Sequence, residues 1–176
     1  MAPKSWLRRI AAVALLVLVL PPSASAISLK REIPVVEEAR HLWATVNVCD
    51  TERAPNTIGI RGSMPGWRDP RETMWMRFQV QYLSDSDGRW HRVTEGGDSG
   101  FVPVGSGRHK ARQAGRSFRI DPNNGKPVVV RGRVSFQWRL RGEVMRRAVA
   151  RTRRGYVSSA GADPPGYTAA TCTITP

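Results

Sequence analysis

Two-residue alternation over three long stretches is the feature that most constrains the fold of this chain. Apolar residues occupy nearly every second position, with polar or aromatic residues between them, over residues 42–48, 74–82 and 128–140. In the last stretch, Val134, Phe136 and Trp138 alternate with arginine, serine and glutamine. Because successive side chains of a β-strand point to opposite faces of its sheet, each stretch predicts a long strand with one buried face.

Shorter segments separated by turn residues complete this pattern. They lie near residues 57–63, 89–94, 100–104, 115–120, 144–152 and 168–174. Clusters of Ser, Asp, Asn, Pro and Gly at 84–88 and 121–125, and the pair Arg141-Gly142, are typical of turns between strands. Eight or nine short strands in about 150 residues predict an all-β fold, and an antiparallel β-sandwich rather than a barrel.

The segment up to Ala26 has the three parts of a secretory signal peptide. Lys4, Arg8 and Arg9 precede an uninterrupted apolar run over residues 10–20, and the residues before Ala26 are small. The apolar run is about half of the roughly 20 residues that span a bilayer, which disfavours a membrane anchor. We therefore expect residues 1–26 to be a signal peptide cleaved near Ala26. The mature chain, which has no transmembrane segment, is then secreted and extracellular or associated with the cell envelope.

Two cysteines lie near opposite ends of the remaining chain. Residues 27–40 are polar and predict an irregular lead-in, and residues 41–176 predict a single domain. Cys49 and Cys172 are the only cysteines. In an oxidising compartment they pair most simply with each other, which would join the first strand to the last; two free buried thiols are the alternative. Two cysteines alone do not make a structural zinc site, and we expect no cofactor.

The strand number, the alternation and the aromatic-rich strand with Phe136 and Trp138 carry a resemblance to known folds. Residues 41–175 resemble the immunoglobulin-like and fibronectin type III-like sandwiches of extracellular proteins. The chain departs from a true immunoglobulin domain because Cys172 falls in the last strand, so the bridge would not cross the middle of the sandwich. The chain is also similar to small secreted proteins of GC-rich bacteria, which implies no activity. Such folds serve many functions, so function has to be argued from particular residues.

The chain is strongly basic, and arginine carries the charge. It holds 28 Lys and Arg against 14 Asp and Glu, a net charge of +14. Residues 1–26 contain three basic residues and no acidic one, so +11 remains without them. A surplus of this size attracts polyanions. GC-rich codons also favour arginine, so the arginines either form a functional surface or are scattered by codon usage.

The densest arginine pattern lies on the predicted hairpin that turns at residues 141–143. Its two strands carry Arg131, Arg133 and Arg139, then Arg147, Arg151 and Arg153. A three-residue tip would place Arg133 opposite Arg151, and Arg131 opposite Arg153. A two-residue tip would lose this register and turn Arg147 inward. Like charges that face each other destabilise a sheet, which indicates an anionic counterpart; the alternative is a solvated edge strand that resists aggregation.

A second polar surface combines Trp75, Gln79 and Gln81 of one strand with Trp43 of another. Exposed indole rings beside amides are suited to neutral sugars, which they bind by stacking and hydrogen bonds. The alternative is that both tryptophans lie under loops or at a sheet edge.

Two short motifs resemble parts of enzyme and metal sites. Residues 97–100, GDSG, match the nucleophile motif of chymotrypsin-like proteases, but the residues that follow differ and the chain is short for two barrels. Asp85-x-Asp87-Gly88 begins like a calcium loop without its further ligands, so a hairpin turn explains it better. The three histidines show no ligand spacing. We expect no catalytic residue and no metal site.

The sequence therefore predicts a secreted, non-enzymatic binding module. Its expected partner is an anionic polymer of the cell envelope or outside it (wall teichoic acid, nucleic acid or acidic glycan), bound through the arginine-rich hairpin. No sequence-specific recognition of nucleic acid is expected. A neutral carbohydrate-binding module is the alternative, a secreted serine hydrolase is the least favoured one, and the oligomeric state stays open.

Overall fold

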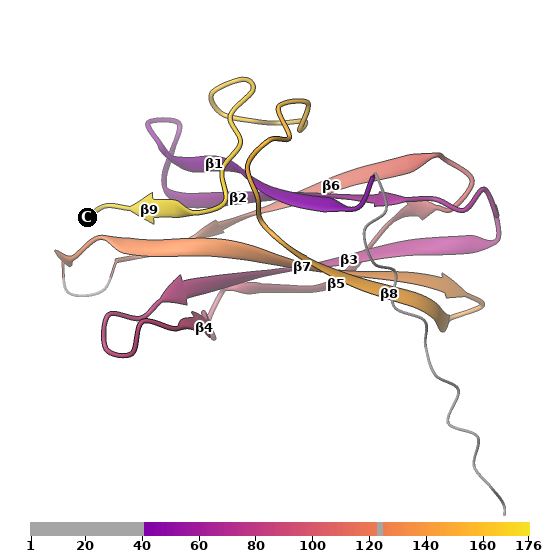
Figure 1. Cartoon of the computed structure of the whole chain (residues 1–176), viewed down its shortest axis with the longest axis horizontal. Coiled ribbons are helices and arrows are strands. Elements are labelled where there is room, and N and C mark those ends of the chain that lie inside the picture. Colours follow the sequence, from indigo (N-terminus) through magenta and orange to yellow (C-terminus); the bar gives the residue numbers. More distant parts are fainter. Residues whose placement is uncertain (1–40, 123–124) are drawn as a thin grey trace, which may run out of the picture. The chain divides into compact units, whose positions relative to one another are not determined.

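The computed structural model describes residues 41–122 and 125–176. The predicted signal peptide (1–26) and lead-in (27–40) lie outside the described residues. The described chain forms nine β-strands and no helix (Figure 1). The strands are β1 (Trp43–Thr51), β2 (Ala54–Pro65), β3 (Glu72–Leu83), β4 (Trp90–Arg92), β5 (Asp98–Ser106), β6 (Ala111–Arg119), β7 (Val128–Leu140), β8 (Glu143–Arg151) and β9 (Cys172–Ile174). All nine predicted segments are confirmed as strands.

The strands form two antiparallel sheets that lie as two layers (Figure 1). The small sheet has the order β1-β2-β6. In the large, six-stranded sheet, β3 and β7 pair along their whole length, β4 and β5 pair with the far edge of β3, and β8 and β9 pair with the far edge of β7. The predicted all-β antiparallel sandwich is confirmed, and this architecture is compatible with an immunoglobulin-like fold.

The alternating apolar residues fill the space between the sheets, as the period of two predicts. Most of the completely buried side chains come from β3 and β7 in the large sheet and from β1 and β2 in the small one. They include Met74, Met76, Phe78, Val80, Val134, Phe136, Trp138, Val46, Ile58, Ile60 and Met64. Each large side chain buried in this way stabilises the fold by about 1.5–3 kcal/mol. The indole Nε1 of Trp138 also donates a hydrogen bond to the Pro65 carbonyl oxygen at 2.7 Å, so its one polar atom is satisfied.

A β-bulge at Asn47 changes which residues of β1 face the core. Val46 pairs with Ile60, but Val48 pairs with Gly59, so the strand loses one step of its alternation. The prediction that Val48 lies on the buried face is therefore wrong: Val48 is half-buried on the outer side, and Cys49 takes the inward position. Gly59 is required here, because a Cβ at this position would lie 2.7 Å from the Val48 Cβ atom.

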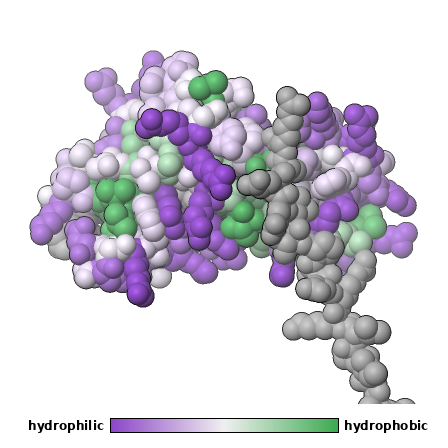
Figure 2. Space-filling view, in the orientation of Figure 1, coloured by the Kyte–Doolittle hydropathy of each residue, from purple (hydrophilic) through white to green (hydrophobic). Residues whose placement is uncertain are grey.

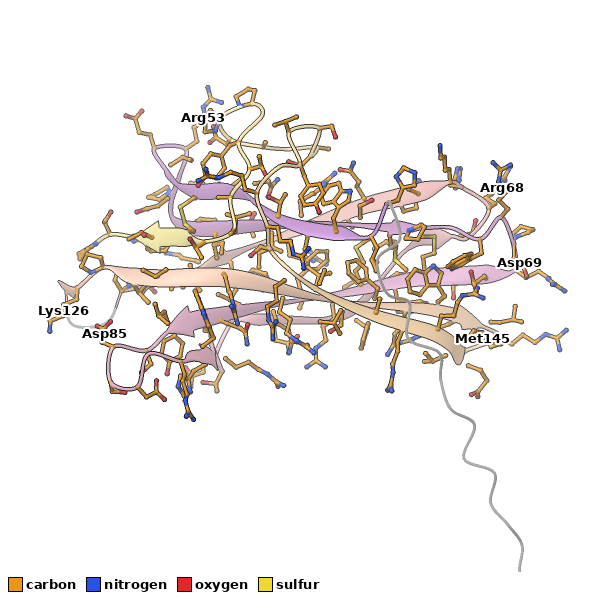
Figure 3. The ribbon with its side chains drawn as sticks, viewed as in Figure 1. Arg53, Arg68, Asp69, Asp85, Lys126 and Met145 are labelled. Carbon is orange, nitrogen blue, oxygen red and sulfur yellow. A yellow bond between two sulfur atoms is a disulfide. The ribbon has the colours of Figure 1, made fainter. Side chains whose placement is uncertain are left out.

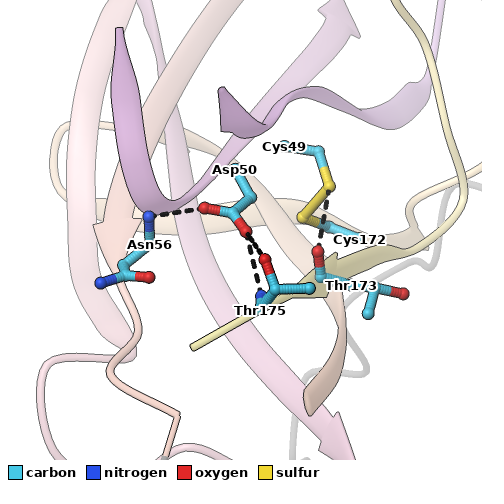
Figure 4. Close-up of a disulfide and its surroundings, with 6 residues drawn as sticks. All are labelled: Cys49, Asp50, Asn56, Cys172, Thr173 and Thr175. Atoms are coloured by element: carbon cyan, nitrogen blue, oxygen red, sulfur yellow. Dashed lines mark hydrogen bonds between the residues drawn. A yellow bond between two sulfur atoms is a disulfide. The ribbon is translucent and has the colours of Figure 1, made fainter. Parts of the chain in front are cut away.

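The inward turn of Cys49 allows the disulfide that closes the sandwich (Figure 4). Cys49 and Cys172 are bonded, with 5.4 Å between their Cα atoms and a sequence separation of 123. Beside them, the Asp50 carboxylate accepts hydrogen bonds from the Asn56 backbone nitrogen (2.7 Å) and from the backbone nitrogen and hydroxyl of Thr175 (3.0 and 2.9 Å). The Thr175 backbone hydrogen bond is the main reason that the pKa of Asp50 is lowered. The predicted link between first and last strands is confirmed.

The segment after β8 crosses from the large sheet to the small one (Figure 1). The backbone nitrogen of Arg153 donates to the Ala44 carbonyl at 2.9 Å, and Val46 and Ala169 exchange two hydrogen bonds of 3.0 Å. These contacts satisfy backbone groups on the free edge of β1, which would otherwise be open to another strand. No helix among the described residues is long and apolar enough to cross a membrane.

Candidate anion-binding groove

The hairpin of β7 and β8 has a two-residue tip and a bulge, and together they decide where its arginines point. Leu140 pairs with Glu143, and both tip residues have positive φ, 51° at Arg141 and 88° at Gly142, as a tight hairpin turn requires. The ladder then shifts by one residue beyond the pair of Arg139 with Val144, because Trp138 pairs with Arg146. The extra residue in β8 is Met145, which Figure 3 labels near the tip.

This bulge restores the register that a two-residue tip was expected to lose. Arg133 lies opposite Arg151, and Gln137 lies opposite Arg147, so Arg147 points outward with them. The expectation that a two-residue tip turns Arg147 inward is wrong, because the additional residue at Met145 reverses the phase of the strand. Arg153 lies beyond the end of β8, and its backbone nitrogen donates a hydrogen bond to Ala44 of the small sheet. It therefore does not form the pair with Arg131 that a three-residue tip predicted.

Arginines from four strands gather on the outer face of the large sheet. The register places there Arg77 of β3, Arg92 of β4, Arg131, Arg133 and Arg139 of β7, and Arg147 and Arg151 of β8. Nitrogen-tipped side chains project from this sheet away from the small one in Figure 3. Hydrophilic residues likewise cover much of the described surface in Figure 2, with small and separate hydrophobic areas. The strands of this sheet carry three acidic side chains: Glu72 is buried, Glu143 lies at the hairpin tip, and Asp98 pairs with Arg77.

Five of the six predicted anion-binding arginines line a single groove. The groove has a volume of about 840 Å³ and follows the outer edge of β8 to the start of β1. Its lining consists of Arg131, Arg133, Arg147, Arg151 and Arg153, with Leu42, Trp43, Ala44, Ala148, Val149, Ala150, Thr152 and Tyr156. No carboxylate is present in this lining. Arg139, the sixth candidate, lies outside it and places its guanidinium over Trp75, 4.3 Å from the ring centroid.

Two groove arginines are held by neutral partners instead of acids. Arg131 Nε donates to Gln81 Oε1 at 3.0 Å, and an Arg133 terminal nitrogen donates to Gln79 Oε1 at 2.8 Å. These glutamines orient the guanidinium groups without cancelling their charge. None of the ion pairs between described residues involves a predicted anion-binding arginine. Within the described part of the chain, the guanidinium groups of Arg131 and Arg133 are therefore held in place without an ion pair, and only Asp98 partly offsets the charge of Arg133.

The pKa shifts of these arginines reflect burial and mutual repulsion. Partial burial is the main cause that lowers the pKa of Arg131, and the nearby Arg151 lowers it further. Burial also lowers the pKa of Arg133; Arg92, Arg151 and Arg77 lower it further, and Asp98 opposes the effect. An arginine stays protonated in a protein despite such shifts. Arg92, Arg131, Arg133 and Arg151 are called the arginine cluster below. Within it, the like charge of Arg151 acts on Arg131, and the like charges of Arg92 and Arg151 act on Arg133.

Arg77 differs from the cluster because it has an acidic partner. Its Nε lies 2.8 Å from Asp98 Oδ1, and Gln79 Nε2 donates to the other carboxylate oxygen at 2.8 Å. The Arg77 hydrogen bond is the main reason that the pKa of Asp98 is lowered to about 2. The Arg77–Asp98 pair therefore neutralises the middle of the face and leaves its charge concentrated around β7 and β8.

The residues of the predicted sugar-binding surface do not lie together. Trp43 is on the outer side of the small sheet, only 8% exposed, and Tyr156 stacks on it with ring centroids 4.6 Å apart. Trp75 is on the outer face of the large sheet, where Arg139 covers its ring and its Nε1 donates to Thr73 Oγ1 at 3.0 Å. Gln79 and Gln81 serve as acceptors for the arginines. Neither indole offers an open face like that expected for stacking on a neutral sugar.

Ser99 and the Asp85–Gly88 turn have structural partners. The Ser99 hydroxyl accepts a hydrogen bond from the Phe78 backbone nitrogen at 2.9 Å and donates to the Gly100 carbonyl at 2.7 Å. A serine nucleophile instead needs a base within hydrogen-bond reach, and in the described structure no histidine is bonded to Ser99. Asp87 accepts from the Arg89 backbone nitrogen (3.0 Å) and pairs with His91 (2.8 Å). Across residues 41–122 and 125–176, no group of three or more His, Cys, Asp and Glu is placed to hold a metal ion.

Sequence reasoning missed Arg77, Arg92 and Tyr156 as parts of this region. Alternation over residues 74–82 puts Arg77 on the polar face of its strand, but the strands that lie beside it are decided by the tertiary fold. Comparisons of the chain with protein-family models, with curated proteins and with solved structures find no match.

Proposed function

We propose that this chain is an exported, non-enzymatic module that binds an anionic polymer in the groove beside β8. One observation carries the proposal: five arginines from two strands and the following segment line one groove that contains no carboxylate. Codon usage alone gives no reason for arginines to converge on one groove. The disulfide is consistent with an oxidising compartment outside the cytoplasm.

The geometry supports anion binding for two physical reasons. Guanidinium groups form bidentate, charge-assisted hydrogen bonds with carboxylate, sulfate and phosphate, and each such bond is worth about 1.5–3 kcal/mol. Gln79 and Gln81 also hold two of the guanidinium groups in place before a ligand arrives, which reduces the side-chain entropy lost on binding. A negatively charged ligand that lies between arginines of like charge also reduces the repulsion between them, and this adds to the free energy of binding.

The test is binding of residues 27–176 to a panel of anionic and neutral polysaccharides and to wall teichoic acid, each at low and high salt. We expect binding to the anionic members only, with an affinity that falls steeply as salt rises. The informative variant is the double substitution Arg133→Gln and Arg151→Gln. Because it removes two facing charges from the groove, we expect at least about a tenfold loss of affinity, together with a weaker salt dependence.

The matched control is the double substitution Arg53→Gln and Arg108→Gln. It removes the same net charge from two exposed turn residues outside the groove. Removing the repulsion between Arg133 and Arg151 should leave the fold intact or slightly more stable, so thermal unfolding separates a binding defect from a folding defect. The proposal is refuted if both double variants lose the same affinity, or if the wild-type chain binds no member of the panel.

A further inference from the structure

The geometry points to a more specific ligand: we infer that the groove holds an extended acidic glycan, which must reach from Arg147 at one end to the arginine cluster at the other. Binding then needs a minimum chain length. This inference rests on the proposed function and deepens it by naming the class of the polymer and its orientation.

Charge in the groove is concentrated at two places along β8. Arg147 lies opposite Gln137, whereas Arg151 lies opposite Arg133 and next to Arg131, within the arginine cluster. Arg151 lies four residue steps beyond Arg147, which corresponds to about 14 Å along a strand. A ligand that contacts both positions therefore needs anionic groups about this far apart.

The stretch between the two charged positions is uncharged. Ala148, Val149 and Ala150 line the groove there, and Val149 is 53% exposed and lies opposite Ser135. Apolar surface of this kind suits the ring carbons of a sugar chain between its acidic groups. The lining continues from Arg147 along the second half of β8 to Arg153, so an extended chain that lies parallel to the strand follows the groove.

The arrangement of aromatic rings favours a glycan over single-stranded nucleic acid. Proteins that bind single strands stack successive bases on a series of open aromatic rings. The aromatic rings around this groove are packed against other side chains. Tyr156 stacks on Trp43, and the guanidinium carbons of Arg131 and Arg139 lie 4.0 and 4.3 Å from the ring centroids of Trp90 and Trp75. Carboxylate or sulfate groups on sugars need only the arginines.

The experiment measures binding of heparin-derived oligosaccharides, from disaccharide to decasaccharide, by calorimetry at one fixed salt concentration. Heparin serves as a probe because it carries both carboxylate and sulfate groups. We expect the affinity of the wild-type chain to rise in a step of about tenfold or more at the length that first reaches both charged positions, because the second contact is intramolecular. Arg147→Gln should remove this step, and it should lower the affinity for the decasaccharide by a larger factor than the affinity for the disaccharide. Arg108→Gln, which removes an equal charge outside the groove, should retain the step.

Three outcomes would overturn the inference while leaving anion binding in place. The first is an affinity that rises only in proportion to the number of anionic groups. The second is an Arg147→Gln variant that loses the same factor for the shortest and the longest oligosaccharide. The third is an oligothymidylate that binds more tightly than a glycan of equal charge, which would assign the groove to nucleic acid. Absence of binding to full-length heparin and to all other anionic polymers would instead remove the proposed function itself.

Discussion

The disulfide between Cys49 and Cys172 should supply a large part of the stability of this protein, because it closes a very long loop. A cross-link restricts the unfolded chain more strongly as the loop grows, and the relation is logarithmic. The sequence separation of 123 gives a loop-closure contribution of about 5 kcal/mol at 25 °C. This is an upper figure, since measured contributions are commonly 2–4 kcal/mol.

The measurement is urea unfolding of the oxidised chain, of the same chain after reduction and of the variant Cys49→Ala with Cys172→Ala. Reduction keeps every side-chain atom, so it isolates the cross-link from the cavity that truncation of the buried Cys172 would leave. We expect a loss of about 2–5 kcal/mol in the free energy of unfolding in both cases. The slope of that free energy against urea should also increase, because an uncrosslinked chain exposes more surface when it unfolds.

Asp50 provides the control for this experiment, because its contacts join the same two strands without a covalent bond. Asp50→Asn weakens the hydrogen bonds to Asn56 and Thr175 and leaves the disulfide in place. A loss near 1 kcal/mol is expected for this change. The loop-closure reasoning is refuted if reduction costs no more than Asp50→Asn, because local contacts would then account for the whole effect.

Three further substitutions test the charged face and the core. Asp98→Asn should remove a contribution of about 1 kcal/mol, after allowance for the partial exposure of the Arg77–Asp98 pair. The pKa of the Asp98 carboxyl is about 2 in the folded chain against an ordinary value of 3.8, so this contribution is fully present above pH 3.8 and is lost toward pH 2. The free energy of unfolding should therefore fall less steeply with pH over this range in the variant than in the wild-type chain. Gly132→Ala should destabilise by about 1–3 kcal/mol in urea unfolding, since the added Cβ would lie 2.7 Å from a neighbouring side-chain carbon. Trp138→Phe leaves the buried Pro65 carbonyl without its hydrogen-bond donor, so we expect the free energy of unfolding to fall by about 1–3 kcal/mol. An unchanged midpoint of thermal unfolding would contradict this expectation.

The candidate groove could be predicted only in part. The alternation placed Arg131, Arg133 and Arg139 on one face of β7, because the period of a strand is a local property. It also places Gln79 and Gln81 on the polar face of β3, where the sequence pattern predicts a sugar-binding surface with Trp75. Their role as acceptors for the arginines depends on β3 lying beside β7, and strand order is a tertiary property.

Fold class and the disulfide follow from the sequence because they depend on patterns and counts. Alternation and turn residues predict an antiparallel sandwich, and two cysteines in an oxidising compartment leave one intramolecular pairing. The direction of individual side chains does not follow, because one extra residue in a strand reverses every position beyond it. The bulge at Asn47 turns Cys49 inward, and the bulge at Met145 turns Arg147 outward. Both depend on the neighbouring strand, so only the tertiary structure could decide which way Cys49 and Arg147 point and that the arginines converge.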